Sequence, residues 1–424
     1  MRENDQLPTP KRLSDSPYFK IFTSRRMAVM VLLGFSSGLP RPLTWGTLQA
    51  WLTTDGLDLK TIGIFSLVGL PYVLKFLWAP LMDRFVPPWL GRRRGWILPV
   101  QFLLIASIIL MALCSPAKMP LAIAVLAFMV AFISASQDIV IDAYRTDVLP
   151  DEERGLGAAT SIFGYRMAML VASPLAYIMA DRAGWQNTYI FMAVFMIIGM
   201  CGTFFGQEPD QRVIPPKTMQ EAVWGPLKDF FSRKSALLLI LFVILYKLGD
   251  AYAGALTTTF LLRGVHFTLT EVGTLNKAIG IIATIVGALF GGTLMVKFGL
   301  FRSLMFFGIL QMVSNLAFMV LAWIGKSYPA MIVAVSFENL AGGMGSTAFV
   351  AFVMALCNKR YSATQFALLS SLAALGAVVI SPTSGYVVEA VGWPTFFFIT
   401  TLVAIPGLVL LWLLRNDIIN IKEA

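Results

Sequence analysis

Long apolar segments dominate this sequence and restrict the folds it can adopt. The hydrocarbon core of a bilayer is about 30 Å thick, so a helix needs about 20 mostly apolar residues to cross it. Charged residues make up only 13% of the chain, against about 25% in soluble domains. We therefore expect an all-α integral membrane protein with twelve transmembrane helices. The predicted helices cover residues 25–52, 61–85, 95–114, 119–147, 154–180, 186–206, 236–262, 271–297, 300–324, 329–357, 362–390 and 394–414.

Basic residues are distributed unevenly between the two sides of these helices. Twelve crossings place both termini on one side, and 23 of the 33 Lys and Arg residues fall there. The opposite side holds Lys60, Lys118, Arg182, Arg263 and Lys326. Cytoplasmic loops carry the excess of Lys and Arg in membrane proteins, so we expect 1–24 and 415–424 to be cytoplasmic. The first 20 residues lack the apolar segment and cleavage site of a secretory signal.

This charge asymmetry accounts for the net charge of +10, so we expect no nucleic-acid partner. Cys114, Cys201 and Cys357 form no CxxC motif and have no neighbouring histidine, which excludes a recognisable disulfide framework or metal site. The one histidine, His266, follows the predicted helix 236–262, where we expect a loop. No catalytic motif or phosphate-binding loop is recognisable. We expect a membrane-embedded monomer that is not an enzyme, binds no metal and needs no cofactor.

The two halves of the chain resemble each other. "APLMDRF…GRRRG" follows the second predicted helix and "GGTLMVKFGLFR" the eighth, while "PDEERGLGAATS" and "NKRYSATQFALLSS" follow the fourth and the tenth. The polar segment 207–235 separates the halves as a cytoplasmic linker, which leaves six-helix bundles over 25–206 and 236–414. Paired bundles of this kind favour a transporter with its substrate site near the membrane midplane. A channel with an internal repeat is the alternative.

The loop after the second predicted helix resembles the signature of the major facilitator superfamily. The matching residues are Ala79, Leu81, Asp83, Arg84, Gly91, Arg92 and Arg93, although "FVPPWL" makes the spacing longer than usual. The resemblance implies the major facilitator fold, with two pseudo-symmetric six-helix bundles. A helix-end Asp facing Arg across a loop usually holds helices together, so we assign structural gating roles to Asp83, Arg84, Arg92 and Arg145.

Four further segments resemble the AmpG muropeptide permease family: "GFSSGLPRPLTWGTLQAWL", "PYVLKFLWAPLMDR", "SQDIVIDAYR" and "GYRMAML". The resemblance covers nearly the whole chain. It implies import of anhydro-muropeptides through the bacterial inner membrane, driven by the proton motive force. Acetyl-CoA transporters of a related branch share the Gln-Asp…Asp pattern, so an acetyl-CoA or other anionic metabolite transporter is one alternative. A membrane sensor that binds muropeptide without moving it is another.

Charged residues inside the predicted helices are functional candidates, because each charge at a helix centre costs about 2.5–3.5 kcal/mol on insertion scales. Asp138, Asp142 and Arg145 share one face of the fourth helix, since 100° separates successive residues. Two carboxylates one turn apart repel each other, and burial favours their protonated form. Asp138 and Asp142 are therefore proton-coupling candidates. Asp138 either handles a proton or substrate or holds Arg145 and Arg166 in place, and for Asp142 we favour the structural role.

The second half holds two further proton-coupling candidates, Asp250 and Glu338. Lys247 and Asp250 are three positions apart in the seventh helix. They either neutralise each other or exchange partners when Asp250 is protonated and Lys247 meets a substrate carboxylate. Glu338 precedes Asn339 and a glycine-rich run, and its own helix offers no basic partner. It is either a proton site or part of a pair between helices.

Substrate recognition requires cations for carboxylates and aromatic side chains for sugar rings. Arg41, Trp45 and Gln49 are four positions apart and form one helical stripe, and "GLPRP" should bend this helix. We interpret the nearby Trp51 as an anchor at the membrane interface. The remaining substrate-binding candidates are Tyr72, Lys75, Gln137, Arg166, Lys247 and Lys277. This excess of cations suits both muropeptide carboxylates and acetyl-CoA.

Overall fold

The computed structural model describes residues 24–149, 154–208, 231, 235–356 and 362–420. In this part of the chain every regular element is helical, and α denotes α-helices while η denotes 3-10 or π turns. The first bundle consists of α2 (Arg25–Gly38), α3 (Pro40–Thr44), α4 (Gly46–Thr54), α5 (Leu59–Ile64), η2 (Phe65–Gly69), α6 (Leu70–Leu74), η3 (Lys75–Leu77), α7 (Ala79–Arg84), α8 (Arg94–Ala112), α9 (Pro120–Val148), α10 (Arg154–Leu170), η4 (Val171–Leu175), α11 (Ala176–Ala183), α12 (Trp185–Phe195) and α13 (Ile197–Phe205).

The second bundle begins after the predicted linker 207–235, most of which lies outside the described residues. It consists of α15 (Ala236–Leu245), α16 (Leu248–Gly254), α17 (Thr257–Thr259), η5 (Phe260–Gly264), α18 (Leu269–Glu271), η6 (Val272–Ala278), α19 (Ile279–Phe298), α20 (Leu300–Ile324), α21 (Tyr328–Leu356), α22 (Ser362–Ile380), η7 (Ser381–Thr383), α23 (Ser384–Leu413) and α24 (Arg415–Asn420).

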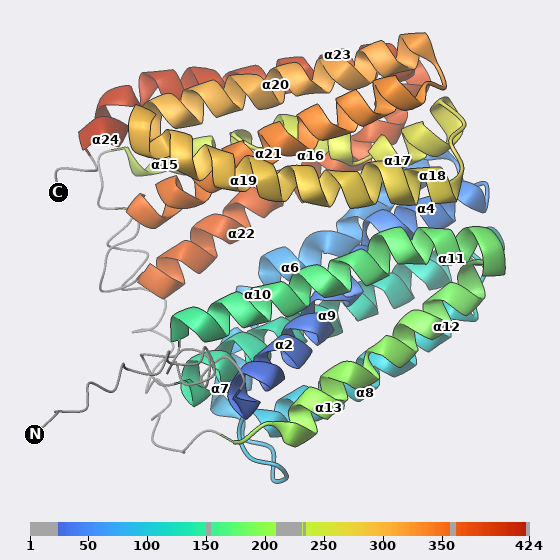
Figure 1. Cartoon of the computed structure of the whole chain (residues 1–424), viewed down its shortest axis with the longest axis vertical. Helices are drawn as coiled ribbons and strands as arrows, with labels where there is room; N and C mark the ends of the chain where they lie inside the picture. The colour runs from blue at the N-terminus through green and yellow to red at the C-terminus, as the bar shows by residue number, and fades with distance from the viewer. Residues whose placement is uncertain (1–23, 150–153, 209–230, 232–234, 357–361, 421–424) are drawn as a thin grey trace, which may run out of the picture.

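The two bundles lie side by side, with the first half of the chain in one and the second half in the other (Figure 1). The first described helix, α2, begins at the end of the bundles where the last one, α24, lies, on the left in Figure 1. We call the opposite end, where α4, α11, α17 and α18 lie, the distal end. This arrangement agrees with the predicted all-α fold of two bundles.

Ten helical segments among the described residues are long and apolar enough to cross a membrane. The predicted helix 25–52 is not among them, because it is divided at Leu39 and Trp45 into the shorter helices α2, α3 and α4. The predicted helices 362–390 and 394–414 fall in one continuous segment, Leu368–Leu413. Gly392 interrupts that segment with φ 75° and ψ 170°, a conformation that glycine adopts without steric cost. The count of twelve stays a prediction.

Close helix packing within each bundle depends on glycine. A Cβ at Gly34 in α2 would lie 2.1 Å from the carbonyl oxygen of Ser161 in α10, and a Cβ at Gly287 in α19 would lie 2.2 Å from that of Leu340 in α21. Small residues let membrane helices approach closely and gain van der Waals contact. The two bundles therefore use the same packing device.

Trp51 corrects one expectation from the sequence. Only 4% of its surface is exposed, and its ring lies 4.7 Å from that of Tyr189 and 6.3 Å from that of Trp185. Trp51 is thus part of an aromatic core in the first bundle, and its interpretation as an interface anchor was wrong. His266, in contrast, is exposed in the predicted loop, with φ 64°.

Candidate functional site: a central cavity between the bundles

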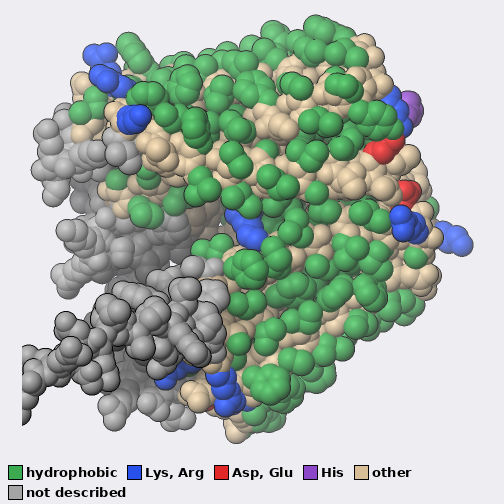
Figure 2. Space-filling model, viewed as in Figure 1, with side chains coloured by type: hydrophobic (Ala, Val, Ile, Leu, Met, Phe, Trp, Pro, Cys, Tyr) green, Lys and Arg blue, Asp and Glu red, His purple; other side chains and the backbone are tan. Residues whose placement is uncertain are grey.

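The two bundles enclose a central cavity of about 780 Å³. Its walls come from α3, α4, η2, α6, α10 and η4 of the first bundle and from α16, α17, η6, α19, α21 and α22 of the second. Figure 2 shows the hollow between the bundles, with Lys and Arg side chains at its inner end. The volume falls within the range of about 300–1,000 Å³ that is typical of small-molecule sites.

Eight of the predicted site residues line this cavity: Arg41, Trp45, Gln49, Tyr72, Arg166, Lys247, Lys277 and Glu338. Five others do not line it: Lys75, Gln137, Asp138, Asp142 and Asp250. The cavity brings together residues from both halves that the sequence could relate only by their position inside helices. Their roles in binding and proton coupling stay predictions.

A broken helix forms one wall of the cavity. Trp45 separates α3 from α4 with φ −123° and ψ −99°, three residues after the "GLPRP" segment where the bend was predicted, whereas Leu39 within that segment keeps helical dihedral angles. Two buried tyrosines stabilise the break, because Tyr189 Oη donates to the carbonyl oxygen of Leu43 at 2.8 Å and Tyr177 Oη donates to that of Gly46 at 2.7 Å. Backbone groups freed inside a membrane need such partners. Nothing in the local sequence identifies these tyrosines, which lie more than 130 positions further along the chain.

Aromatic side chains cover part of the cavity wall. The Trp45 ring lies against Gly69, where an added Cβ would be 2.9 Å from the ring. The Arg41 guanidinium lies 5.8 Å from the centre of the Tyr72 ring, within the range of a cation–π contact. This wall therefore combines flat apolar surfaces with a cation.

Four cations and one acid are found among the described residues that line the cavity. Lys247 pairs with Asp250 at 3.7 Å and donates to the carbonyl oxygen of Gly342 at 3.4 Å. Lys277 donates to the Thr258 hydroxyl at 3.1 Å. Because Lys247 has an acidic partner, the remaining positive charge comes from Lys277 and from Arg41 and Arg166 on the opposite wall.

Glu338 is the acid on the cavity wall. Its carboxylate accepts a hydrogen bond from Asn339 Nδ2 at 2.6 Å, and it lies within electrostatic range of Lys247, Lys277 and Asp250. The basic partners that its own helix lacks therefore come from neighbouring helices. Glu338 and the Lys247–Asp250 pair belong to one cluster of charges in the second bundle.

Asp138 lies behind the cavity wall in the first bundle. Its carboxylate accepts a hydrogen bond from the Ser37 hydroxyl, and Lys75, Arg41 and Asp142 are within electrostatic range. This setting leaves both of its predicted roles open.

Gln137 is completely buried one position earlier on α9. It donates to the carbonyl oxygen of Ser36 at 2.9 Å and accepts a hydrogen bond from the Ser36 hydroxyl at 3.1 Å. These bonds join α9 to α2. In this conformation Gln137 therefore connects helices and does not face the cavity.

Asp142 and Arg145 form an ion pair at 3.0 Å, and Arg145 also donates to the Ser161 hydroxyl at 3.4 Å. Arg166 was predicted to share in neutralising Asp138 and Asp142. In the described part of the chain it pairs with neither acid, and its guanidinium approaches Met169 Sδ at 3.5 Å. Arg166 lines the central cavity instead.

The loop motif after the second predicted helix surrounds a pair that the sequence did not identify. The side chains of Asp83 and Arg84 lie outside the described residues, and Arg92 is partly buried. The neighbouring Arg93 forms a buried ion pair with Asp147 at 2.7 Å. This bond joins the beginning of α8 to the end of α9.

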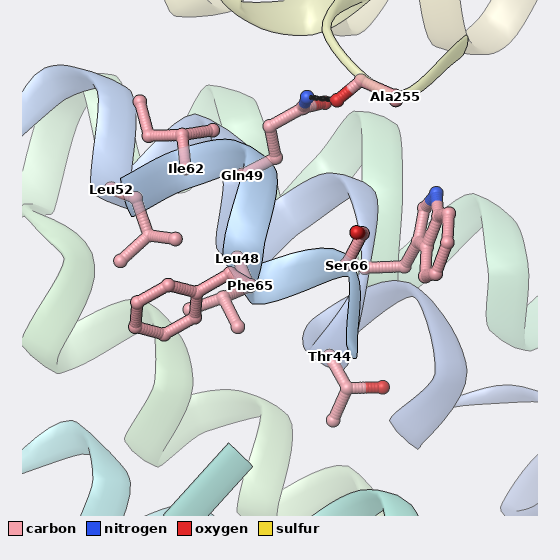
Figure 3. A pocket seen from close by; sticks show the side chains of 9 residues that line it. Thr44, Leu48, Gln49, Leu52, Ile62, Phe65, Ser66 and Ala255 are labelled. Atoms are coloured by element: carbon pink, nitrogen blue, oxygen red, sulfur yellow. Dashed lines mark hydrogen bonds between the residues drawn. The ribbon is translucent and has the colours of Figure 1, made fainter. Parts of the chain in front are cut away.

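Hydrogen bonds between the bundles close the distal end. Figure 3 shows Gln49 donating to the carbonyl oxygen of Ala255. One helical turn further, the hydroxyl oxygens of Thr53 and Thr259 lie 2.9 Å apart. Another turn further, Arg263 donates to the carbonyl oxygen of Leu57 and, from Nε at 2.9 Å, to that of Thr53. We call these three contacts the distal gate.

Polar pairs at the periphery strengthen this closure. Lys60 pairs with Glu389 at 2.9 Å, and the Thr270 hydroxyl donates to Asp181 at 2.6 Å. Asp58 lies within electrostatic range of Arg263, and the hydrogen bond from the Thr61 hydroxyl lowers the pKa of the Asp58 carboxyl. Each exposed pair contributes little alone, about 0–1 kcal/mol. Together with the distal gate they keep the cavity closed at this end.

This fold and cavity define a membrane transporter of two helical bundles, and comparison with known proteins identifies the class. A model of the Major Facilitator Superfamily matches residues 30–368 and 251–420. The chain therefore belongs to the Major Facilitator Superfamily. The same fold occurs in a bacterial homolog of the human lysosomal transporter Spinster, solved in an inward-facing and unoccupied conformation, with a TM-score of 0.73 and 13% sequence identity over 94% of this chain and 98% of that chain.

More similar sequences point to one branch of the superfamily. The chain is 54% identical over 404 residues to the anhydromuropeptide permease of Escherichia coli (strain K12). This alignment covers 95% of this chain and 82% of that protein. It is 38% identical over 414 residues to an uncharacterized protein of Haemophilus influenzae, covering 94% of this chain and 96% of the relative. The predicted fold class, transporter class and family resemblance are confirmed.

Proposed function

We propose that this protein imports anhydro-muropeptides, the GlcNAc-anhydro-MurNAc disaccharide and its peptides, from the periplasm to the cytoplasm in symport with protons. The observation that carries the proposal is the central cavity between the two bundles. It is closed at the distal end, and its walls combine aromatic and cationic side chains. The 54% identity to an anhydromuropeptide permease supports this substrate class.

The cavity walls suit the two parts of such a substrate. Trp45 and Tyr72 offer flat apolar surfaces to sugar rings, and Gln49 and Asn276 offer amide groups to hydroxyl and acetamido groups. Arg166 has no acidic partner among the described residues and can bind a carboxylate in a bidentate manner. The sugar would then lie against α4 and α6, with the peptide carboxylates near α10.

The closure at the distal end supports transport by alternating access. Secondary transporters of this type rock one bundle against the other around a fixed central site. The distal gate opens toward the periplasm in the other conformation, if the basic loops and both termini face the cytoplasm. The proposal includes this orientation, a location in the inner membrane and a monomeric state.

Proton coupling is assigned to buried acids in both bundles. Protonation of Asp250 would release Lys247 for a substrate carboxylate, and Glu338 lies within electrostatic range of the same lysine. Asp138 is the corresponding candidate in the first bundle. No further cofactor is required, because the proton motive force supplies the free energy.

Binding and uptake by purified protein test the substrate assignment. We expect saturable binding of GlcNAc-anhydro-MurNAc-tripeptide, which excess unlabelled disaccharide-peptide displaces and acetyl-CoA does not, and uptake of the same compound into proteoliposomes. Displacement by acetyl-CoA at similar concentrations would favour an anionic metabolite transporter, which the cationic cavity also suits. Binding without uptake would indicate a membrane sensor.

A further inference from the structure

Gln49 lies where the central cavity meets the distal gate. Its side chain lines the central cavity and also a second cavity of about 20 Å³, bordered by Thr44, Phe65 and Ser66 (Figure 3). Its amide nitrogen donates to the carbonyl oxygen of Ala255 in the opposite bundle. Among the described residues of the distal gate, Gln49 is therefore the one whose side chain also lines the central cavity.

The acceptor of this hydrogen bond lies at a break in the second bundle. α16 ends at Gly254 and α17 begins at Thr257, and between them Leu256 has φ −129° and ψ 7°. A backbone carbonyl that loses its helical partner at membrane depth needs another donor. The Gln49 amide is such a donor only while the two bundles touch.

Opening of the distal gate removes Ala255 from the reach of Gln49. A substrate bound in the open cavity excludes water from this amide, and an amide left without an acceptor there costs about 1–3 kcal/mol, so the bound substrate has to supply the second acceptor. The 20 Å³ cavity beside it corresponds to about one water molecule and gives the amide room to turn. The Trp45 ring, one turn earlier on the cavity wall, is where we place a sugar ring.

We propose that Gln49 is a specificity-determining residue with two alternating acceptors: the Ala255 carbonyl when the distal gate is closed, and the acetamido carbonyl oxygen of a substrate amino sugar when the gate is open. This inference rests on the proposed function. Closure transfers the amide from the substrate to Ala255, so the substrate loses one hydrogen bond as the cavity closes to the periplasm. That loss weakens binding about 2–10-fold, since a neutral hydrogen bond contributes about 0.5–1.5 kcal/mol, and it favours release into the cytoplasm.

The test combines a gate measurement without ligand and a binding measurement with two ligands. Spin labels at Asn187→Cys and His266→Cys, two exposed positions of different bundles at the distal end, report gate opening in protein without its three native cysteines. The ligands are GlcNAc-anhydro-MurNAc and the same disaccharide without the acetyl group on the glucosamine. The variant is Gln49→Leu, which removes the donor at similar size, and Thr53→Val is the matched control, because Thr53 belongs to the gate but does not line the cavity.

We expect both variants to increase the gate-open population without ligand, and only Gln49→Leu to reduce the preference for the acetylated ligand, by about 2–10-fold. If Gln49→Leu is poorly expressed, Gln49→Glu, which replaces the amide by an acceptor, should give the same two changes. An unchanged ligand preference in Gln49→Leu would overturn the inference and leave Gln49 as a gate contact only. An altered preference with an unchanged gate population would also overturn it. Failure of the wild-type protein to bind either disaccharide would instead contradict the proposed function.

Discussion

The hydroxyl oxygens of Thr53 and Thr259 lie 2.9 Å apart between the two bundles, and the two residues are 206 positions apart in the chain. The same separation relates Gln49 to Ala255 and Leu57 to Arg263, four positions to either side. The constant separation shows that the two contacting segments run in the same direction along the distal gate. Each bundle therefore contributes one segment to a regular row of contacts between the two halves.

The guanidinium of Arg263 stabilises the closed distal gate. We expect Arg263→Ala to shift the population toward the gate-open form about 10–100-fold, since hydrogen bonds from a charged group contribute about 1.5–3 kcal/mol. Distances between the labels at Asn187→Cys and His266→Cys measure the shift. Arg182→Ala, which removes an exposed cation at the same end, is the control and should leave the distances unchanged. Equal distributions in both variants would show that Arg263 does not hold the gate.

The contact between Gly69 and the Trp45 ring predicts the effect of a single methyl group. In Gly69→Ala the new Cβ would lie 2.9 Å from the ring, so Trp45 must move away from its place on the cavity wall. We expect affinity for the disaccharide to fall about 2–10-fold, as for the loss of one aromatic contact of about 0.5–1.5 kcal/mol. Titration calorimetry measures the change.

Gly254→Ala is the matched control for this prediction. Gly254 also lines the cavity, but nothing lies within 4 Å of a Cβ built there. Its substitution should leave the affinity within experimental error. If both variants bind the disaccharide as tightly as the wild type, Trp45 does not contact the sugar.

Arg166 predicts a preference for acidic peptides. Arg166→Gln should lower the affinity for the disaccharide-tripeptide about 10–100-fold, because a charge-assisted hydrogen bond contributes about 1.5–3 kcal/mol. The same ligand with amidated carboxylates should bind both proteins equally, which separates loss of the ion pair from a change in cavity shape. Equal losses for both ligands would argue against carboxylate recognition by Arg166.

The buried pair of Arg93 and Asp147 predicts a large effect on stability. Only 6% of the Arg93 side chain and 13% of the Asp147 side chain are exposed. Arg93→Met leaves the Asp147 charge without this partner, which in buried pairs costs about 3–5 kcal/mol. A lower thermal unfolding temperature in detergent should report it. Replacing Asp147 by Asn in the same protein should restore part of the loss, whereas additive losses would show that the two residues act independently.

The sequence predicted the fold from properties that are local to each segment. Apolar length, the excess of basic residues on one side and "GLPRP" indicate helices, orientation and a helix break without knowledge of packing. Charges inside apolar segments also indicated most of the cavity, since Arg166, Lys277 and Glu338 have to avoid lipid.

The missing parts depend on contacts between distant segments. Tyr177 and Tyr189 stabilise the break in the first helix from more than 130 positions away, and neither has a distinctive local pattern. Arg93 and its neighbour Arg92 look alike in the sequence, but helix ends that meet in three dimensions select Arg93 for the pair with Asp147. Trp51 was assigned to the membrane interface because its burial by two other aromatic rings has no local signal.

Uptake of labelled GlcNAc-anhydro-MurNAc-tripeptide into proteoliposomes under an imposed inward proton gradient tests whether this protein is a proton-coupled importer. We predict accumulation above the external concentration that collapses when a protonophore is added, in vesicles where protein orientation has been verified. Asp138→Asn and Asp250→Asn should reduce this accumulation more than they reduce binding. Equilibration without accumulation, or uptake that does not respond to the protonophore, would contradict proton-coupled import.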